Sequence, residues 1–382
     1  MPGIKNRDMN KNPFITSGYE GPEYFCDRQK ETAELTKLIK NGNNVVLMSP
    51  RRIGKTGLLW HSFSRPEINN EYITFIIDIL STSNMSDLVL AMGRSIVSEL
   101  MPKGQKAIAR FAKTVTSLRP VITLDQMGNT SVSIEVTQGG SPEYTLEQIF
   151  KYIDEADKHV FVAIDEFQQI TYYPEKNVEA VLRTYIQRSK NSTWVFSGSS
   201  RHLLSEMFME PSRPFYASTS FLPLECIPCE TYSAFAKHLF EANGKSLDEA
   251  VPELVYKKFE GVTWFMQKVM NRLYSDTGIG EICDASMVDY AISEIVGGNG
   301  AIYTDLLYQL SPRQKDLLLA INKEGHARGI TSGGFVKKHS LQSPSTVQTA
   351  AKALIDRQII TCNRGEYEIY DKFFALWLDS MR

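Results

Sequence analysis

The segment that most constrains the fold is VVLMSPRRIGKTG at residues 45–57. Its first four residues are apolar, which is typical of a strand covered on both faces of a sheet. Gly54, Lys55 and Thr56 follow a short loop and open a predicted helix over 55–64. A strand, a loop and a helix in this order form the context of a phosphate-binding loop. The pattern predicts an α/β fold with this loop at one edge of a parallel sheet.

The first 228 residues repeat this alternation of strands and helices. Predicted strands cover 45–48, 72–77, 160–164, 194–197 and 221–224, and predicted helices cover 27–39, 55–64, 86–116, 146–156 and 178–190. Nearly continuous apolar strands that alternate with helices indicate a parallel sheet with helices on both faces. A separate hairpin is expected where VITLD and SVSIEV flank Gly128 and Asn129.

The strand pattern stops after Pro228. Residues 231–310 predict four or five helices, with breaks near 276–278 and 297–300. From Ser311 the order of helix, helix, helix and two-stranded ribbon is typical of a winged helix. We therefore predict four parts, which are a flexible N-terminus at 1–18, a nucleotide-binding core at 19–228, a helical part at 229–306 and a winged-helix domain at 307–382.

Composition excludes several classes of protein. The chain of 382 residues has a formal net charge of -2, which argues against wholesale attraction to polyanions. The sequence lacks an apolar run of the roughly 20 residues that cross a bilayer, and its start is polar, so we expect a cytoplasmic protein without membrane contact. The five cysteines include one close pair, Cys226 and Cys229, and a chance spacing explains it better than a metal or redox site.

The loop residues have the types that phosphate binding needs. Lys55 would reach the β- and γ-phosphates, and the Thr56 hydroxyl would ligate Mg²⁺. Ser49 replaces the usual first glycine, and a serine can serve there if its φ is negative. The candidate nucleotide-binding residues of the loop are Ser49, Pro50, Arg51, Arg52, Ile53, Gly54, Lys55, Thr56 and Gly57.

The two arginines of the loop, Arg51 and Arg52, have two possible targets. They could point at phosphates or at the C-terminal tail of the chain. We favour the tail, because Lys55 and Mg²⁺ already meet the charge of the phosphates.

Two further strand ends carry polar side chains. Asp165 and Glu166 follow an apolar strand, where Asp165 would hold Mg²⁺ and Glu166 would act as general base on water. A solvated carboxylate pair is the alternative for these two residues taken alone. Ser199 follows the next strand and would sense the γ-phosphate or orient water, and Ser197 is nearly as suitable. A polar cap between strand and helix is the alternative for the serines.

Together, MSPRRIGKTGLL, VAIDEFQQI and FSGSSRHLLSEMF resemble the archaeal-type ATPase family, in the STAND branch of the AAA+ P-loop NTPases. The resemblance implies central strand order 5-1-4-3-2, with ATP and Mg²⁺ held between the core and a helical lid at 229–306. It also implies that Phe25 and Arg28 lie near adenine. The start of a helix is the competing explanation for these two residues.

The chain departs from the family pattern at two places. Ala217 and Ser218 stand where members often carry Gly-Arg, and Thr263 stands where related proteins tend to have proline. Arg213 could reach a phosphate in place of the missing arginine, although a surface arginine is the simpler explanation. An arginine finger is worth about 10³- to 10⁵-fold in rate, so we expect slow or partner-dependent hydrolysis.

The sequence leaves three functions open. The leading hypothesis is a Mg²⁺-dependent ATP-binding conformational switch with slow ATPase activity. The alternative is a DNA-binding regulator with a structural nucleotide site, since residues from Ser311 onward carry 11 Lys and Arg against 7 Asp and Glu. Its base-reading candidates are Gln348, Thr349 and Lys352. The third is an assembly module that binds a protein partner or forms a homo-oligomer.

Overall fold

The computed structural model describes residues 11–381 except 125–129 and 138–139. The chain forms two compact units. We call Ser17–Thr231 the core, and the second unit joins Tyr232–Arg382 to the N-terminal residues up to Thr16. Among the described residues, no helix combines the length and the apolar character that a membrane crossing requires.

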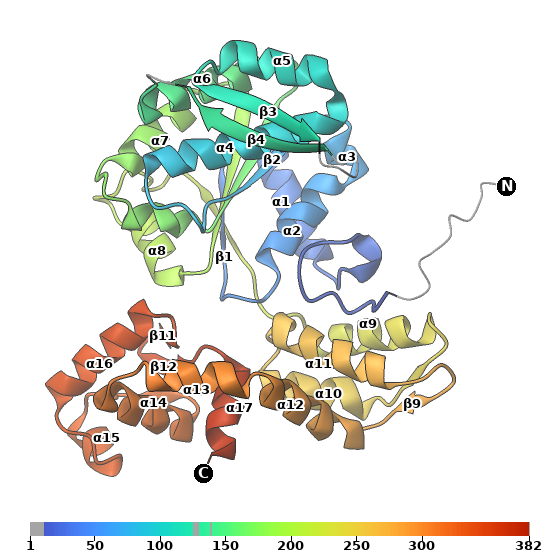
Figure 1. The fold of residues 1–382 in the computed structure, drawn as a ribbon, viewed down its shortest axis with the longest axis vertical. Helices are drawn as coiled ribbons and strands as arrows, with labels where there is room; N and C mark the ends of the chain where they lie inside the picture. The colour runs from blue at the N-terminus through green and yellow to red at the C-terminus, as the bar shows by residue number, and fades with distance from the viewer. Residues whose placement is uncertain (1–10, 125–129, 138–139, 382) are drawn as a thin grey trace. The chain divides into compact units, whose positions relative to one another are not determined.

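A five-stranded parallel sheet forms the centre of the core (Figure 1). Its strands are β1 (Val45–Met48), β2 (Ile73–Asp78), β5 (Val160–Asp165), β6 (Ser192–Gly198) and β7 (Ser220–Pro223). Their order is β2-β5-β6-β1-β7. Counted in chain order and read from the other edge, this is 5-1-4-3-2, so the expected topology is confirmed.

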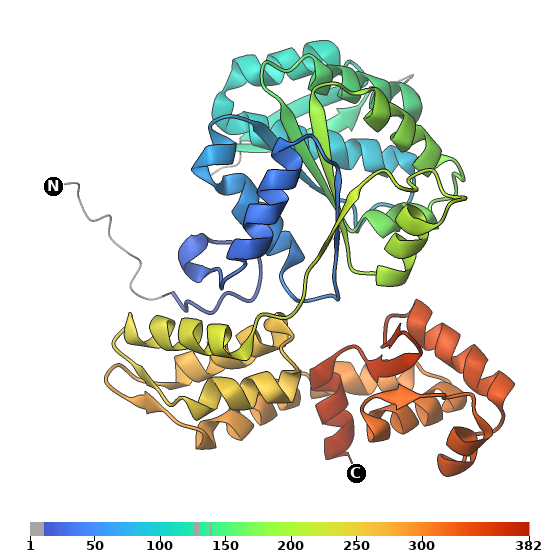
Figure 2. The ribbon, with the colours of Figure 1, turned by 180° about the vertical axis from the view of Figure 1, so that it is seen from behind.

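Helices cover both faces of this sheet, as Figures 1 and 2 show. The core helices are α1 (Gln29–Lys40), α2 (Lys55–Ser64), α3 (Pro66–Asn69), α4 (Met85–Leu100), α5 (Gln105–Thr114), α6 (Pro142–Asp154), α7 (Val178–Arg188) and α8 (Arg201–Met209), with 3₁₀ turns η1 (Pro22–Tyr24), η2 (Met101–Lys103) and η3 (Phe167–Tyr172). All six residues of β5 are buried, and the first five are apolar, as expected of a strand covered on both faces.

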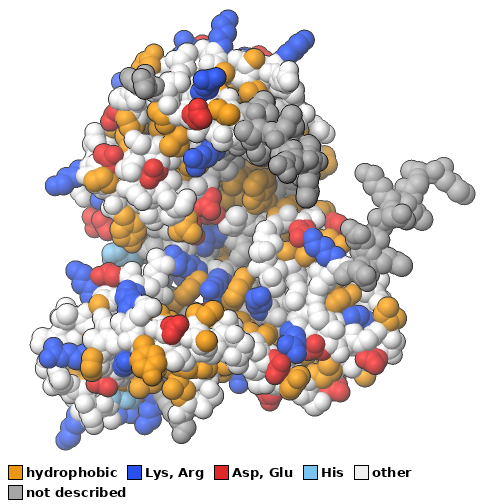
Figure 3. Space-filling model, viewed as in Figure 1, with side chains coloured by type: hydrophobic (Ala, Val, Ile, Leu, Met, Phe, Trp, Pro, Cys, Tyr) orange, Lys and Arg blue, Asp and Glu red, His pale blue; other side chains and the backbone are white. Residues whose placement is uncertain are grey.

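On the face of the core drawn in Figure 3, acidic and basic side chains are interspersed.

The long helix predicted over 86–116 is wrong. The structure has two helices, α4 and α5, with η2 between them. Pro102 lies in η2, and Gly104 has a φ of 89°, a conformation that glycine adopts at little cost. The predicted hairpin exists as the antiparallel pair β3 (Leu118–Leu124) and β4 (Thr130–Val136). Its predicted turn at Gly128 and Asn129 lies outside the described residues.

Five helices follow β7 and precede the winged helix, in agreement with the sequence prediction, and the first of them begins in the last three residues of the core. They are α9 (Cys229–Glu241), α10 (Ala250–Phe259), α11 (Thr263–Asp276), α12 (Ser286–Gly298) and α13 (Gly300–Tyr308). The breaks after Asp276 and Gly298 were both expected. A parallel pair of two-residue strands, β8 (Ser246–Leu247) and β9 (Ile282–Cys283), was not predicted because such short strands leave no periodic pattern.

The winged-helix order is present in the rest of the second unit. Its elements are α14 (Pro312–Glu324), β10 (Ala327–Arg328), α15 (Gly333–Lys338), α16 (Pro344–Asp356), β11 (Ile360–Asn363), β12 (Glu366–Ile369) and α17 (Lys372–Ser380). The predicted ribbon is the antiparallel pair β11 and β12, and the unpredicted β10 adds a third strand. Phe373 of α17 packs against Phe259 and Phe265, with ring centroids 5.1 and 5.2 Å apart. These contacts join the winged helix to the preceding helices.

The N-terminal residues 11–16 also belong to the second unit, whereas the sequence predicted a flexible start over 1–18. Phe14 is fully buried, and its ring centroid lies 5.6 Å from that of Phe240. The Asn12 amide donates to the carbonyl oxygen of Asn271 at 2.7 Å. The prediction is therefore wrong for this stretch, because one apolar side chain finds a buried site more than 200 residues away in the sequence.

We expect Phe14→Ala to destabilise the protein by about 3–5 kcal/mol, because it removes a fully buried aromatic ring. Urea unfolding would measure the loss. Phe221→Ala is the matched control, since this phenylalanine is 41% exposed and surface changes stay near about 0.5 kcal/mol. Equal losses in the two variants would contradict the packing of residues 11–16.

Candidate nucleotide-binding site

The loop between β1 and α2 has the backbone that a phosphate-binding loop needs. Gly54 is the residue before α2 and has a φ of 95°, so the backbone conformation requires a glycine at this position. Ser49 has no positive φ, which meets the condition for a serine at this position. Its side chain is fully buried and donates to the Pro50 carbonyl oxygen at 2.9 Å. The Ser49 side chain is therefore bonded within the loop itself, at the point where the chain leaves β1.

Lys55 and Thr56, the first two residues of α2, point to different parts of the site. Lys55 Nζ donates to the Pro50 carbonyl oxygen at 3.0 Å, so the ammonium lies over the loop. Burial lowers the pKa of Lys55, while the nearby carboxylates of Glu166 and Asp165 oppose this shift. The Thr56 hydroxyl donates to Asp165 Oδ2 at 2.5 Å. The end of β5 is thereby joined to the start of α2.

The polar ends of β5 and β6 also meet. Ser197 Oγ donates to Asp165 Oδ1 at 2.8 Å, and Ser199 Oγ donates to Glu166 Oε2 at 2.7 Å. Both serines suggested by the sequence therefore contact the carboxylate pair, each with its own partner. The loop, the carboxylates and the serines lie together at the carboxyl edge of the sheet, where ligands bind in such folds.

A third carboxylate, Asp78, was missed by the sequence reasoning. It is the last residue of β2 and lies directly beside Asp165 in the parallel register. Desolvation raises the pKa of Asp78, and the charges of Asp165 and Glu166 add to the shift. The sequence did contain a signal for Asp78, because an acidic residue at the end of a predicted strand was the criterion that identified Asp165.

The arginines of the loop take up an arrangement that the sequence did not predict. Arg51 Nε donates to Ser199 Oγ at 2.7 Å, so this side chain joins the loop to the end of β6. Arg52 has a φ of 65°, an uncommon conformation for a residue with a side chain. Arg201, the first residue of α8, lies close enough to lower the pKa of Lys55 and was also missed.

The segment before α1 contacts the loop and α2. Arg28 is 3% exposed and donates to the Ile53 carbonyl oxygen at 3.0 Å. The Phe25 ring stacks on His61 of α2, with centroids 4.5 Å apart. A Cβ at Gly57 would lie 3.1 Å from the Phe25 ring, so this glycine allows the close approach. Arg28 therefore contacts the loop and Phe25 contacts α2, while their place near adenine stays a prediction.

Arg213 has different partners from those the sequence proposed. Its guanidinium lies 2.5 Å from Glu179 of α7 and 3.5 Å from Glu206 of α8. Glu179 is mostly buried, and this burial raises its pKa while Arg213 opposes the shift. The described contacts of Arg213 therefore join two helices of the core, and none of them involves the loop or the carboxylate pair.

The donor set at the start of α2 suits Mg²⁺, which prefers oxygen ligands and keeps several waters. Thr56 Oγ1 and Asp165 Oδ2 converge to 2.5 Å, and the Thr56 side chain is exposed. Asp165 is 3% exposed and is fixed on its other oxygen by Ser197. Thr56 and Asp165 are thus the residues that could hold the ion.

Comparisons with known proteins match two segments of the chain to known domains. Residues 25–269 match the model of an ATPase domain predominantly from Archaea, and residues 301–380 match that of a probable winged helix domain. A search of curated proteins finds no match. The assignment to the STAND branch stays a prediction.

Solved structures share the fold at low sequence identity. A Walker-type ATPase of Pyrococcus abyssi is 16% identical with a TM-score of 0.67, over 96% of this chain and 99% of its own. The ORC2 protein of Aeropyrum pernix, in ADPNP-ADP complexes, is 15% identical with a TM-score of 0.58, over 97% of each chain. The ORC1 protein of the same organism, in complex with DNA, is 12% identical with a TM-score of 0.52, over 94% of each chain.

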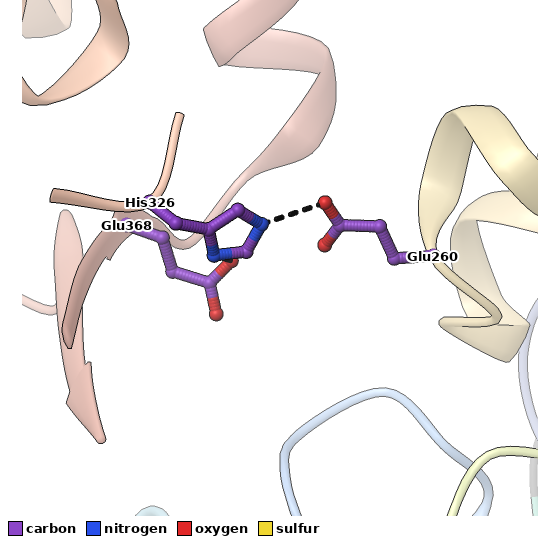
Figure 4. Close-up of side chains that lie close together, drawn as sticks. All are labelled: Glu260, His326 and Glu368. Atoms are coloured by element: carbon purple, nitrogen blue, oxygen red, sulfur yellow. Dashed lines mark hydrogen bonds and ion pairs between the residues drawn. The ribbon is translucent and has the colours of Figure 1, made fainter. Parts of the chain in front are cut away.

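A second cluster of titratable side chains lies within the second unit. Glu260, His326 and Glu368 each offer one ligand atom within 4.8 Å of the others, and Figure 4 shows His326 directed at Glu260. Lys372 Nζ lies 2.7 Å from Glu260 and 2.6 Å from Glu368. An ammonium therefore compensates both carboxylates, and we interpret the cluster as an ionic junction between the end of α10 and the winged helix.

The junction is expected to depend on pH through His326. This side chain faces Glu260, Glu366, Glu368 and the Lys372 ammonium, and its hydrogen bond to Glu260 raises its pKa above the usual 6.5. Protonated His326 thus stabilises the folded state below about pH 6.5, and the contribution is lost as pH rises through the raised pKa. Because both partners are well exposed, we expect only about 0.2–1 kcal/mol.

The measurement compares melting temperatures of the wild type and His326→Gln across pH 5.5 to 9. The gap should be widest at the acid end and close as pH rises. A gap that is constant over this range would contradict the charged His326–Glu260 contact.

Proposed function

Because the chain belongs to the family of ATPase domains that occur predominantly in Archaea, we propose that it binds ATP with Mg²⁺ at residues 49–57 and hydrolyses it slowly as a conformational switch. One observation carries the proposal. The Thr56 hydroxyl contacts Asp165, and Ser199 contacts Glu166, so three strand ends supply phosphate-binding, metal-binding and water-activating groups at one edge of the sheet.

Each residue then has a defined part in phosphoryl transfer. The backbone of the loop and Lys55 bind the β- and γ-phosphates, and Lys55 stabilises the charge that develops on them. Thr56 and Asp165 hold Mg²⁺, which when bound neutralises phosphate charge. Glu166 accepts a proton from the attacking water, and Ser199 orients the Glu166 carboxylate from the end of β6.

Slow turnover follows from the arginines near the site. Arg213 is engaged by Glu179 and Glu206, and Ala217 and Ser218 stand where family members often carry Gly-Arg. Loss of the arginine that family members often carry at this position removes a contribution to the transition state of about 10³- to 10⁵-fold in rate. A long-lived ATP complex is a property of a switch, which is the reason we prefer this role to that of a motor.

We expect Glu166→Gln to bind ATP normally and to lose about 10²- to 10⁴-fold in single-turnover hydrolysis, because the general base is removed. Lys55→Ala should lose both binding and hydrolysis, because it removes the phosphate ligand. Nucleotide titration and phosphate release measure the two effects. Glu34→Gln, an exposed position on α1, is the matched control and should behave as the wild type. Hydrolysis that is equal in Glu166→Gln and the control would contradict the mechanism.

A second candidate function, DNA binding by the winged helix, is favoured by one observation. Glu366 and Glu368 of the ribbon, whose charges would repel a phosphate backbone, are paired with Arg328 and Lys372. The candidate readers Gln348, Thr349 and Lys352 are exposed on α16. The ORC1 structure of Aeropyrum pernix contains DNA, which makes this a reasonable use of a similar domain.

If DNA is bound in this way, retention of duplex DNA should fall steeply with salt, because phosphate contacts release counterions. Lys352→Ala should reduce the slope of a plot of log K, the DNA association constant, against log salt concentration by about 1, because it removes one phosphate contact. Lys30→Ala on α1 removes the same charge outside the winged helix and should leave the slope unchanged. Salt-independent retention, or none at 50 mM salt, would argue against this function.

A further inference from the structure

Gln168 occupies an unusual position beside the carboxylate pair. It lies in η3, two residues after Glu166, and is 3% exposed. Its Nε2 donates to Glu166 Oε2 at 2.5 Å, the same oxygen that accepts the bond from Ser199. Its Oε1 has no hydrogen bond within the described structure. A half-satisfied buried amide costs about 1–3 kcal/mol, so packing alone does not explain a glutamine here.

Gly198 at the end of β6 makes room for this side chain. A Cβ at Gly198 would lie 2.0 Å from Gln168 Oε1, which is closer than any real contact. The backbone does not require glycine, because Gly198 has no positive φ. The missing side chain at this position therefore makes room mainly for Gln168, and also for Leu204, whose Cδ1 would lie 3.1 Å from such a Cβ.

Glu166 itself needs to be held. Its φ of 56° and ψ of 40° are left-handed, a conformation that costs a residue with a side chain about 1–2 kcal/mol. Its side chain is only partly buried, so packing leaves it some freedom. Two donors on Oε2 remove that freedom, while the described contacts include no hydrogen bond to Oε1.

We propose that Gln168 is a positioning residue for ATP hydrolysis, which holds Glu166 Oε2 together with Ser199 so that Oε1 faces the attacking water. This role rests on the proposed function. As the water oxygen bonds to the γ-phosphorus and the bond to the β–γ bridging oxygen breaks, Oε1 takes the proton of the water. Arg51 extends the same chain of donors, because its bond to Ser199 links the loop to the oxygen that Gln168 holds.

The test separates positioning from packing. Gln168→Met keeps the volume and removes the donor, so we expect single-turnover hydrolysis to fall by about 10- to 100-fold, less than loss of the base itself. The affinity for ATP should stay within about 2-fold. Gln169→Met is the matched control, since the neighbouring glutamine donates to the Thr82 carbonyl oxygen and should leave hydrolysis unchanged.

A second substitution changes Gly198, the residue that faces Gln168 Oε1. Gly198→Ala should displace Oε1 and cause a similar fall in hydrolysis, and the double variant with Gln168→Met should be no slower than either single variant. Losses that multiply in the double variant would overturn the steric link. Wild-type hydrolysis in Gln168→Met would overturn the positioning role alone, whereas a wild type without turnover would overturn the proposed function and this role with it.

Discussion

The contact between Thr56 and Asp165 is the interaction on which the rest of the site depends. It joins the first turn of α2 to the end of β5, two segments that are 109 residues apart in the sequence. Asp165 also accepts the bond from Ser197, so one buried carboxylate fixes three elements. Buried carboxylates are costly unless they are hydrogen-bonded, and this requirement fixes α2 and the end of β6 relative to Asp165.

Most of the core could be predicted from the sequence because its strands are short, apolar and separated by clear helices. The strand β1 and the helix α2 begin and end at the predicted residues. Strand order is a different matter, since it depends on pairing between distant segments. Only the resemblance to a known family supplied the order, which the parallel registers of β1 with β6 and β7 confirm.

The residues predicted for the site lie together in the structure, but their contacts were only partly predicted, and their roles stay predictions. Lys55, Thr56, Asp165, Glu166 and Ser199 meet as expected. The partners of Arg213, the position of Asp78 beside Asp165 and the bond from Gln168 to Glu166 were not predicted, because they depend on how separate elements approach one another, which leaves no periodic signal. The burial of Phe14 against Tyr274 could not be predicted for the same reason.

The division of the chain has a consequence for its synthesis. The backbone passes between the two units twice, at Thr16–Ser17 and again at Thr231–Tyr232. A ribosome therefore produces Phe14 first but its partners Phe240 and Tyr274 much later, after the whole core has been made. The buried site of Phe14 is therefore completed only after the whole core has been synthesised, and the core has the residues it needs to fold before that point.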